Sequence, residues 1–146
     1  MLVKTNLLGL AVADAYFLTC ILVFVFRLAK RPEISHTIGY FQFLLSLPLI
    51  YMLVTAPSLQ RPVLYYIQSG LLLLFMVVEL LLDYIYKVDF RQTGWMVISY
   101  VMLFFAATGG MLGIAAKSGQ VGMISAAALF LVMAVLAFVQ RAVTGL

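Results

Sequence analysis

The sequence predicts an all-α integral membrane protein, folded as a bundle of five transmembrane helices. Of its 146 residues, 66% are hydrophobic and only 10% are charged, whereas a soluble domain carries roughly 25% charged residues. Three uncharged stretches, Ile34 to Gln60, Gln92 to Ala116 and Ser118 to Gln140, are each at least 23 residues long. About 20 residues suffice to span hydrocarbon, so we expect a single transmembrane domain over residues 1–146.

The first predicted helix covers residues 5–27 and is interrupted only by Asp14. Its apolar core is longer than that of a signal peptide, and the basic residues Arg27, Lys30 and Arg31 stand where a small-residue cleavage site would be. We therefore expect the helix to be retained. Pro32 and the surrounding charges are expected to end it.

The second and third predicted helices cover residues 36–56 and 63–86. Pro48 lies near the middle of the second, where a missing backbone N–H usually kinks a helix and shapes its packing. A short turn bracketed by Pro57 and Pro62 separates the two helices, and Pro62 suits the opening position of the third.

The fourth and fifth predicted helices cover residues 94–116 and 120–141. Gly109, Gly110 and Gly113 give the fourth helix a face of small residues, on which helices in membranes approach one another closely. The partner of this face is either another helix of the same chain or a second copy. The latter would give a homodimer.

The basic residues predict the orientation of the chain. With five helices, six cations fall on one side: Arg27, Lys30, Arg31, Lys87, Arg91 and Arg141. Three fall on the other: Lys4, Arg61 and Lys117. The positive-inside bias places the C-terminus in the cytoplasm and the N-terminus outside. We expect Arg27, Lys30, Arg31, Lys87 and Arg91 to contact anionic lipid headgroups of the bilayer, and the net charge of +4 to reflect topology, with no nucleic acid as a partner.

Three acids, Asp14, Glu79 and Asp83, lie within these apolar stretches. A carboxylate at membrane depth costs at least a few kcal/mol unless it is protonated, paired or hydrated, so each is a candidate functional group. Glu79 and Asp83 are one helical turn apart, and the same face extends to Gln68 and Tyr86. These four residues predict a polar stripe that faces the bundle interior or an aqueous cavity.

The role of the acids has several readings. Asp83 lies close to Lys87 and Arg91 and could form an ordinary salt bridge at the membrane edge. Asp14 and Glu79 are separated by roughly 9 Å along the membrane normal, at 1.5 Å per residue. Protonated carboxyls could hold helices together, a proton or cation relay could connect them, or they could line a pocket for a polar small molecule or lipid.

Cys20 and His36 are the only cysteine and the only histidine. An internal disulfide, bis-histidine haem ligation and a histidine-rich metal site are therefore excluded within one chain. No phosphate-binding loop or nucleophilic triad is recognisable. We expect no cofactor, no metal site and no catalytic residues.

The sequence favours a small proton- or cation-linked transport or binding protein, with Asp14, Gln68, Glu79, Asp83 and Tyr86 in its polar pathway. One alternative is a non-catalytic membrane subunit or scaffold that binds lipid or a partner protein. A third is a lipid-modifying intramembrane enzyme with Glu79 as acid or base. The first two interpretations differ in their expectation for Glu79. A transport protein predicts that water reaches its side chain, whereas a scaffold predicts a dry, hydrogen-bonded one.

Overall fold

The predicted fold class is confirmed by the computed structural model, which describes residues 2–86 and 94–144. Within these residues the chain is helical and has no strand. The helices are α1 (Leu2–Leu28), α2 (Pro32–Phe43), α3 (Ser46–Thr55), α4 (Val63–Glu79), the π-helix η1 (Leu80–Ile85), α5 (Gly94–Ala116) and α6 (Gln120–Thr144). They make five segments that are long and apolar enough to cross a membrane, because α2 with α3, and α4 with η1, each form one segment.

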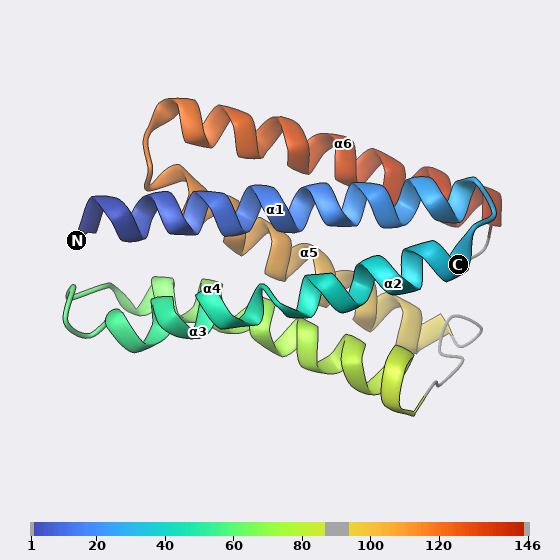
Figure 1. Cartoon of the computed structure of the whole chain (residues 1–146), viewed down its shortest axis with the longest axis horizontal. Coiled ribbons are helices and arrows are strands. Elements are labelled where there is room, and N and C mark those ends of the chain that lie inside the picture. Colours follow the sequence, from blue (N-terminus) through green and yellow to red (C-terminus); the bar gives the residue numbers. More distant parts are fainter. Residues whose placement is uncertain (1, 87–93, 145–146) are drawn as a thin grey trace.

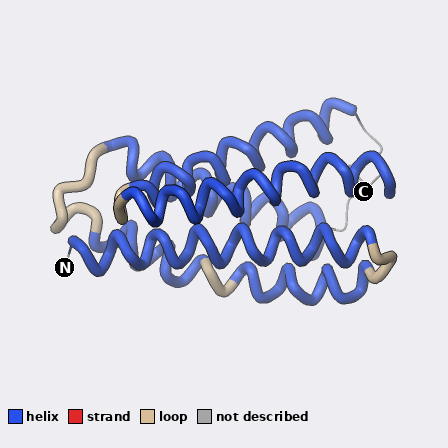
Figure 2. The backbone as a smooth tube through the Cα atoms, turned by 90° about the horizontal axis from the view of Figure 1, so that it is seen from above, coloured by secondary structure: helices blue, strands red, loops and turns tan. Residues whose placement is uncertain are grey.

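Helix α1 lies at the centre of the bundle (Figure 1). It packs against α6, α2, α5 and α3, while α4 packs against α5 and α3. The helices run roughly along one axis, joined by short turns where the chain is described (Figure 2). The N-terminus, the α3–α4 turn and the α5–α6 turn share one end, which we call the Arg61 end; the α1–α2 turn and the end of α6 lie at the other, the Arg27 end.

The second membrane segment differs from its predicted form in two ways. It begins at Pro32, four residues before the expected start, because proline is favoured in the first helical position and Glu33 adds a favourable charge to the first turn. It is also broken at Leu44 and Leu45, one turn before Pro48. Pro48 has no N–H to bond back to Leu44, and the backbone there closes tighter turns of the i to i−3 type.

The third membrane segment changes its helical form directly after Glu79. Residues Leu80–Ile85 form a π-helix, in which the Tyr86 N–H donates to the Leu81 carbonyl at 2.9 Å. The wider turn alters the direction of the side chains that follow Glu79, so a stripe drawn for a regular α-helix does not continue to Tyr86. The other differences are small: α1 begins at Leu2, and α6 continues to Thr144.

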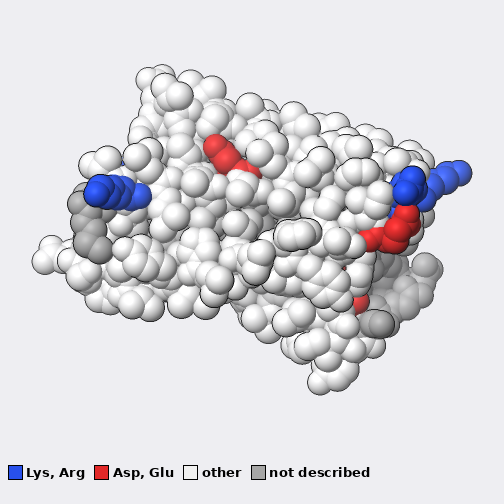
Figure 3. Space-filling model, in the orientation of Figure 1, with Lys and Arg blue, Asp and Glu red and all other residues white. Residues whose placement is uncertain are grey.

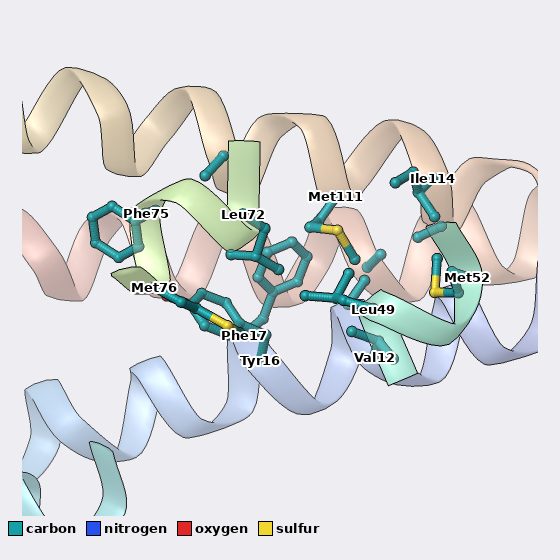
Figure 4. Packing of buried hydrophobic residues seen from close by; sticks show 14 of the residues in the cluster. Val12, Tyr16, Phe17, Leu49, Met52, Leu72, Phe75, Met76, Met111 and Ile114 are labelled. Carbon is teal, nitrogen blue, oxygen red and sulfur yellow. The ribbon is translucent and has the colours of Figure 1, made fainter. Parts of the chain in front are cut away.

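The apolar core fills the middle of the bundle between the two ends. Side chains from α1, α3, α4 and α5 point toward one another there, including those of Tyr16, Leu49, Leu72 and Met111 (Figure 4). All four are at most 1% exposed. The core therefore separates polar groups at the Arg27 end from polar groups at the Arg61 end.

Candidate functional site

Two adjoining cavities lie at the Arg27 end of the bundle. The aromatic cavity has a volume of about 130 Å³ and is lined by α1, α2, α4, α5 and α6. The polar cavity has a volume of about 250 Å³ and lies between α1, α2, α4 and η1. Val23, Arg27, Gln42 and Glu79 line both. Because one water molecule occupies about 30 Å³ of liquid, each cavity has room for several.

The walls of the two cavities differ in chemistry. Rings surround most of the aromatic cavity, contributed by Tyr16, Phe24, Phe75, Tyr100, Phe104, Phe105 and Phe138. The polar cavity is lined instead by Ser35, His36, Asp83 and Tyr84, besides the shared residues. Glu79 thus lies where an apolar compartment meets a hydrophilic one.

Charges of both signs line this pair of cavities. Arg27 and Arg141 contribute two positive charges, and Glu79 and Asp83 contribute two carboxylates. Among the described side chains that line the cavities, the formal positive and negative charges are therefore equal in number.

Hydrogen bonds hold the side chains around Glu79 in place across several helices. The Tyr100 hydroxyl of α5 donates to Glu79 Oε1 at 3.4 Å, which is a long bond. Arg27 donates from Nη1 to Oε1 of the buried Gln140 on α6 at 3.3 Å. The buried Gln42 of α2 donates to the Thr19 hydroxyl of α1 at 2.9 Å. These contacts connect α1 to α2, α1 to α6, and the end of α4 to α5.

Tyr84 closes one side of the polar cavity. Its ring stacks on His36 at 4.1 Å between centroids, and its hydroxyl donates to the His36 carbonyl at 2.8 Å. Gly39 makes this possible, because a Cβ at position 39 would collide with the Tyr84 hydroxyl. The π-helical turn therefore directs Tyr84 toward α2.

The predicted stripe on the third segment is divided in the structure. Glu79 and Asp83 line the polar cavity together. Tyr86 is 70% exposed and lines neither cavity. Gln68 lies on the other side of the apolar core, where its side chain rests against Gly110 and Gly113 of α5.

The glycine face of the fourth membrane segment is used within the chain. A Cβ at Gly110 would lie 3.3 Å from the Gln68 Cα, and one at Gly113 would collide with the Gln68 amide. A Cβ at Gly109 would meet nothing within 4 Å. Gly110 and Gly113 thus permit the close packing of α5 on α4.

Asp14 lies apart from Glu79, between α1 and α6. The Ser125 hydroxyl of α6 donates to Asp14 Oδ2 at 3.4 Å, and Oδ1 is buried without a hydrogen-bond partner in the described part of the chain. Asp14 lines neither of the two cavities. The structure therefore does not bring the first-helix acid and the third-segment acid into one site.

The predicted headgroup residues have different surroundings. Lys30 and Arg31 are exposed, and Arg31 pairs with Glu33 at 2.8 Å. Arg27 is partly buried and lines both cavities, so it belongs to the interior site. Lys87 and Arg91 lie outside the described residues. On the face shown in Figure 3, basic groups lie near the two ends, with a long uncharged surface between them that one acidic patch interrupts.

Sequence reasoning missed Gln42, Gln140, Arg27 and Tyr84 as residues of the site. Gln42 and Gln140 are 4% and 1% exposed. Both are amides within membrane-length apolar segments, and that signal could have identified them. The positions of Arg27 and Tyr84 at the cavities depend on how α1 packs against its neighbours and on the π-helix, which carry no simple sequence signal.

These features define an all-α, multi-pass membrane protein with a charged and aromatic site at one end of its bundle. No protein-family model, curated protein or solved structure matches the chain. In the described residues, no group of three or more His, Cys, Asp or Glu side chains is arranged to hold a metal ion. The function is therefore argued from the site alone.

Proposed function

We propose that this protein is a small proton- or cation-linked transport or binding protein whose exchangeable group is Glu79. The observation that carries the proposal is the position of Glu79 in the walls of both cavities. A carboxylate that held helices together would need only a donor from a neighbouring helix. Glu79 has such a donor in Tyr100, but it also borders space with room for water and ligand.

The preferred ligand is an amphiphile with a dipolar or cationic head and an apolar body. The aromatic walls of one cavity accommodate an apolar group and attract a cation at the ring faces. Arg27 and Glu79, which border both cavities, match the two charges of a dipolar head. A singly positive head would instead compete with a proton for Glu79, and this competition would couple binding to proton movement.

Binding of three matched amphiphiles tests the proposed ligand class. Hexylphosphocholine, hexyltrimethylammonium and hexyl phosphate share one tail and differ in head charge. We expect calorimetry on the full chain in phosphatidylcholine nanodiscs to rank the dipolar head first and the anionic head last. Glu79→Gln should weaken the first two by about tenfold or more, equivalent to about 1.4 kcal/mol. Glu33→Gln is the matched control, because Glu33 is exposed and pairs with Arg31 outside both cavities.

Proton exchange is tested in the same preparation. In weakly buffered solution, binding of hexyltrimethylammonium should release protons from the wild-type protein and from Glu33→Gln, but not from Glu79→Gln. In proteoliposomes, a pH gradient should drive uptake of the same compound only when Glu79 is present. Equal binding and equal proton release in Glu79→Gln and wild type would refute the proposal.

The scaffold alternative has support in the contacts that link helices at this end. Gln42 bonds to α1, and Arg27 bonds to α6, as purely structural cross-links would. Under that alternative Glu79→Gln has no effect on any of the three probes, because an amide preserves size and polarity. The alternative and the first proposal therefore give opposite results in one experiment.

We further propose that the Arg27 end faces the cytoplasm and that the N-terminus lies outside, on the bias of the basic residues. Lys30 and Lys117 are exposed and lie in turns at opposite ends of the bundle. In a Cys20→Ser background, a membrane-impermeant maleimide should label Lys117→Cys in intact cells and Lys30→Cys only after lysis. The reverse pattern would invert the orientation.

We also propose that the protein forms a homodimer. Anionic lipid headgroups are proposed to bind at Lys30 and Arg31. Gly109, next to two glycines that already contact α4, is the part of the glycine face that remains open for a second copy. Native mass spectrometry from nanodiscs should detect dimers that Gly109→Leu reduces. Monomers alone in the wild type would contradict this part of the proposal.

A further inference from the structure

A group of buried polar atoms without partners lies at the Arg61 end of the bundle. It comprises Nε and Nη2 of Arg61 and the hydroxyl of Tyr65, which we call the Arg61 cluster. None of these atoms has a hydrogen-bond partner among the residues described. Tyr65 is 1% exposed and lies in the first turn of α4.

The Arg61 guanidinium is the charged member of this cluster. It always carries its proton, and although the residue as a whole is only partly buried, its Nε and Nη2 are buried, where an N–H group without a partner is unfavourable. Its Cζ atom lies over the Tyr65 ring, 4.5 Å from the centroid, and this cation–π contact stabilises the charge. The N–H edge is not satisfied by this stacking. No described carboxylate lies within ion-pair distance of Arg61.

The two buried nitrogens of Arg61 indicate what is missing. Nε and Nη2 carry the pair of parallel N–H groups along one edge of the guanidinium, which matches two oxygens of a carboxylate or phosphate. The Tyr65 hydroxyl can donate one more hydrogen bond. Gln68 also has a buried oxygen without a partner, but its side chain is held against Gly110 and Gly113 of α5.

We propose that the Arg61 cluster binds a phosphate group, with the Nε and Nη2 edge of Arg61 on two of its oxygens and the hydroxyl of Tyr65 as a further donor. The membrane-spanning segment begins at Val63, two residues after Arg61. The guanidinium therefore lies at the depth where a bilayer changes from hydrocarbon to headgroups. Both a phospholipid headgroup and free inorganic phosphate present the required chemistry.

The site is independent of the Glu79 cavities. It lies at the opposite end of the bundle, beyond the apolar core that contains Leu72, Phe75 and Met76. It takes an anion, whereas the Glu79 site is proposed to take a dipolar or cationic head. Failure of one proposal therefore leaves the other unaffected.

Binding of phosphate to designed variants tests the site. The full chain is delipidated in a neutral maltoside detergent, and inorganic phosphate is titrated by calorimetry. Retention of phosphatidylglycerol is measured in parallel by native mass spectrometry. Arg61→Lys keeps the charge but removes the two-pronged edge, Tyr65→Phe keeps the ring but removes the hydroxyl, and Lys117→Gln removes an exposed cation from another turn at the same end.

We expect Arg61→Lys to weaken phosphate binding or lipid retention at least tenfold and Tyr65→Phe to weaken it three- to tenfold, with Lys117→Gln unchanged. Binding of inorganic phosphate identifies a soluble anion as a ligand; retention of phosphatidylglycerol that millimolar phosphate does not displace identifies a headgroup. Each of these results supports the site. Equal binding by Arg61→Lys and wild type would overturn it. So would the absence of both phosphate binding and lipid retention in the wild type, which would mean that water alone satisfies the cluster.

Discussion

The two ends of the third membrane segment differ in the surroundings of the charged residue that lies there, close to hydrocarbon. At the Arg27 end, Glu79 borders two cavities and accepts a hydrogen bond from Tyr100. At the Arg61 end, the guanidinium is folded over a tyrosine ring, and its buried nitrogens have no partner in the described chain. The first arrangement suits exchange with water, and the second suits capture of a fixed counter-charge.

Chemical access should differ most between the two ends. In a Cys20→Ser background, a cysteine at Glu79 borders cavities with room for water, whereas one at Ser69 is fully buried. We expect a small maleimide to react with Ser69→Cys about a hundredfold more slowly, equivalent to an opening cost of about 2.8 kcal/mol. Reaction rates are followed by mass spectrometry in nanodiscs. Equal rates would show that both ends are hydrated and would remove the contrast.

Between the two ends, a leucine substitution at Gly113 should lower the stability of the protein, whereas the same substitution at Gly109 should be tolerated. A leucine at Gly113 must displace the Gln68 side chain, which overpacks the α4–α5 contact and should cost about 1–3 kcal/mol of stability. Gly109→Leu enters open space, and we expect a change within about 0.5 kcal/mol. Thermal unfolding in detergent measures both. A similar loss in the two variants would place the α4–α5 contact elsewhere.

The wall of the polar cavity provides a smaller test of the same kind. Gly39→Ala brings a methyl group against the Tyr84 hydroxyl, so Tyr84 must leave His36. We expect a loss of about 1 kcal/mol, the order of one broken hydrogen bond with its contact. Gly70→Ala, where a Cβ meets nothing within 4 Å, should instead gain about 0.5–1 kcal/mol from helix propensity. Unfolding curves with the same sign for both would contradict the role of Gly39.

Substitution of Asp14 should have the smallest effect on stability and ligand binding, and this result would support the assignment of the site to Glu79. Asp14→Asn retains a group that can bond to Ser125, and it lies outside both cavities. We expect stability within about 0.5 kcal/mol of wild type and unchanged binding of hexylphosphocholine. Calorimetry in nanodiscs provides the measurement. A loss of binding equal to that of Glu79→Gln would return Asp14 to the pathway.

The sequence by itself determined the class of protein and most of the helix boundaries. Long apolar stretches allow only helices to span hydrocarbon, because every backbone polar group must be satisfied within the segment. Composition therefore predicts the five segments without reference to contacts. The sequence also identified Glu79 and Asp83, since an acid in such a segment is conspicuous wherever its side chain points. The turn at Pro62 was equally readable, because proline at a helix start is a local preference.

Only the tertiary structure decided which polar groups meet. In the π-helix after Glu79, Tyr84 lies against His36 of α2 at the polar cavity and Tyr86 lies at the surface, although both lie within one turn of Asp83. The packing of α1 against four helices brings Arg27 into the cavities and separates Asp14 from Glu79. Periodicity assigns a residue to a face of its own helix, but the neighbour of that face depends on how all the helices pack together. That arrangement is set by many weak contacts at once, such as Gln68 on Gly110 and Gly113, and no single residue encodes it.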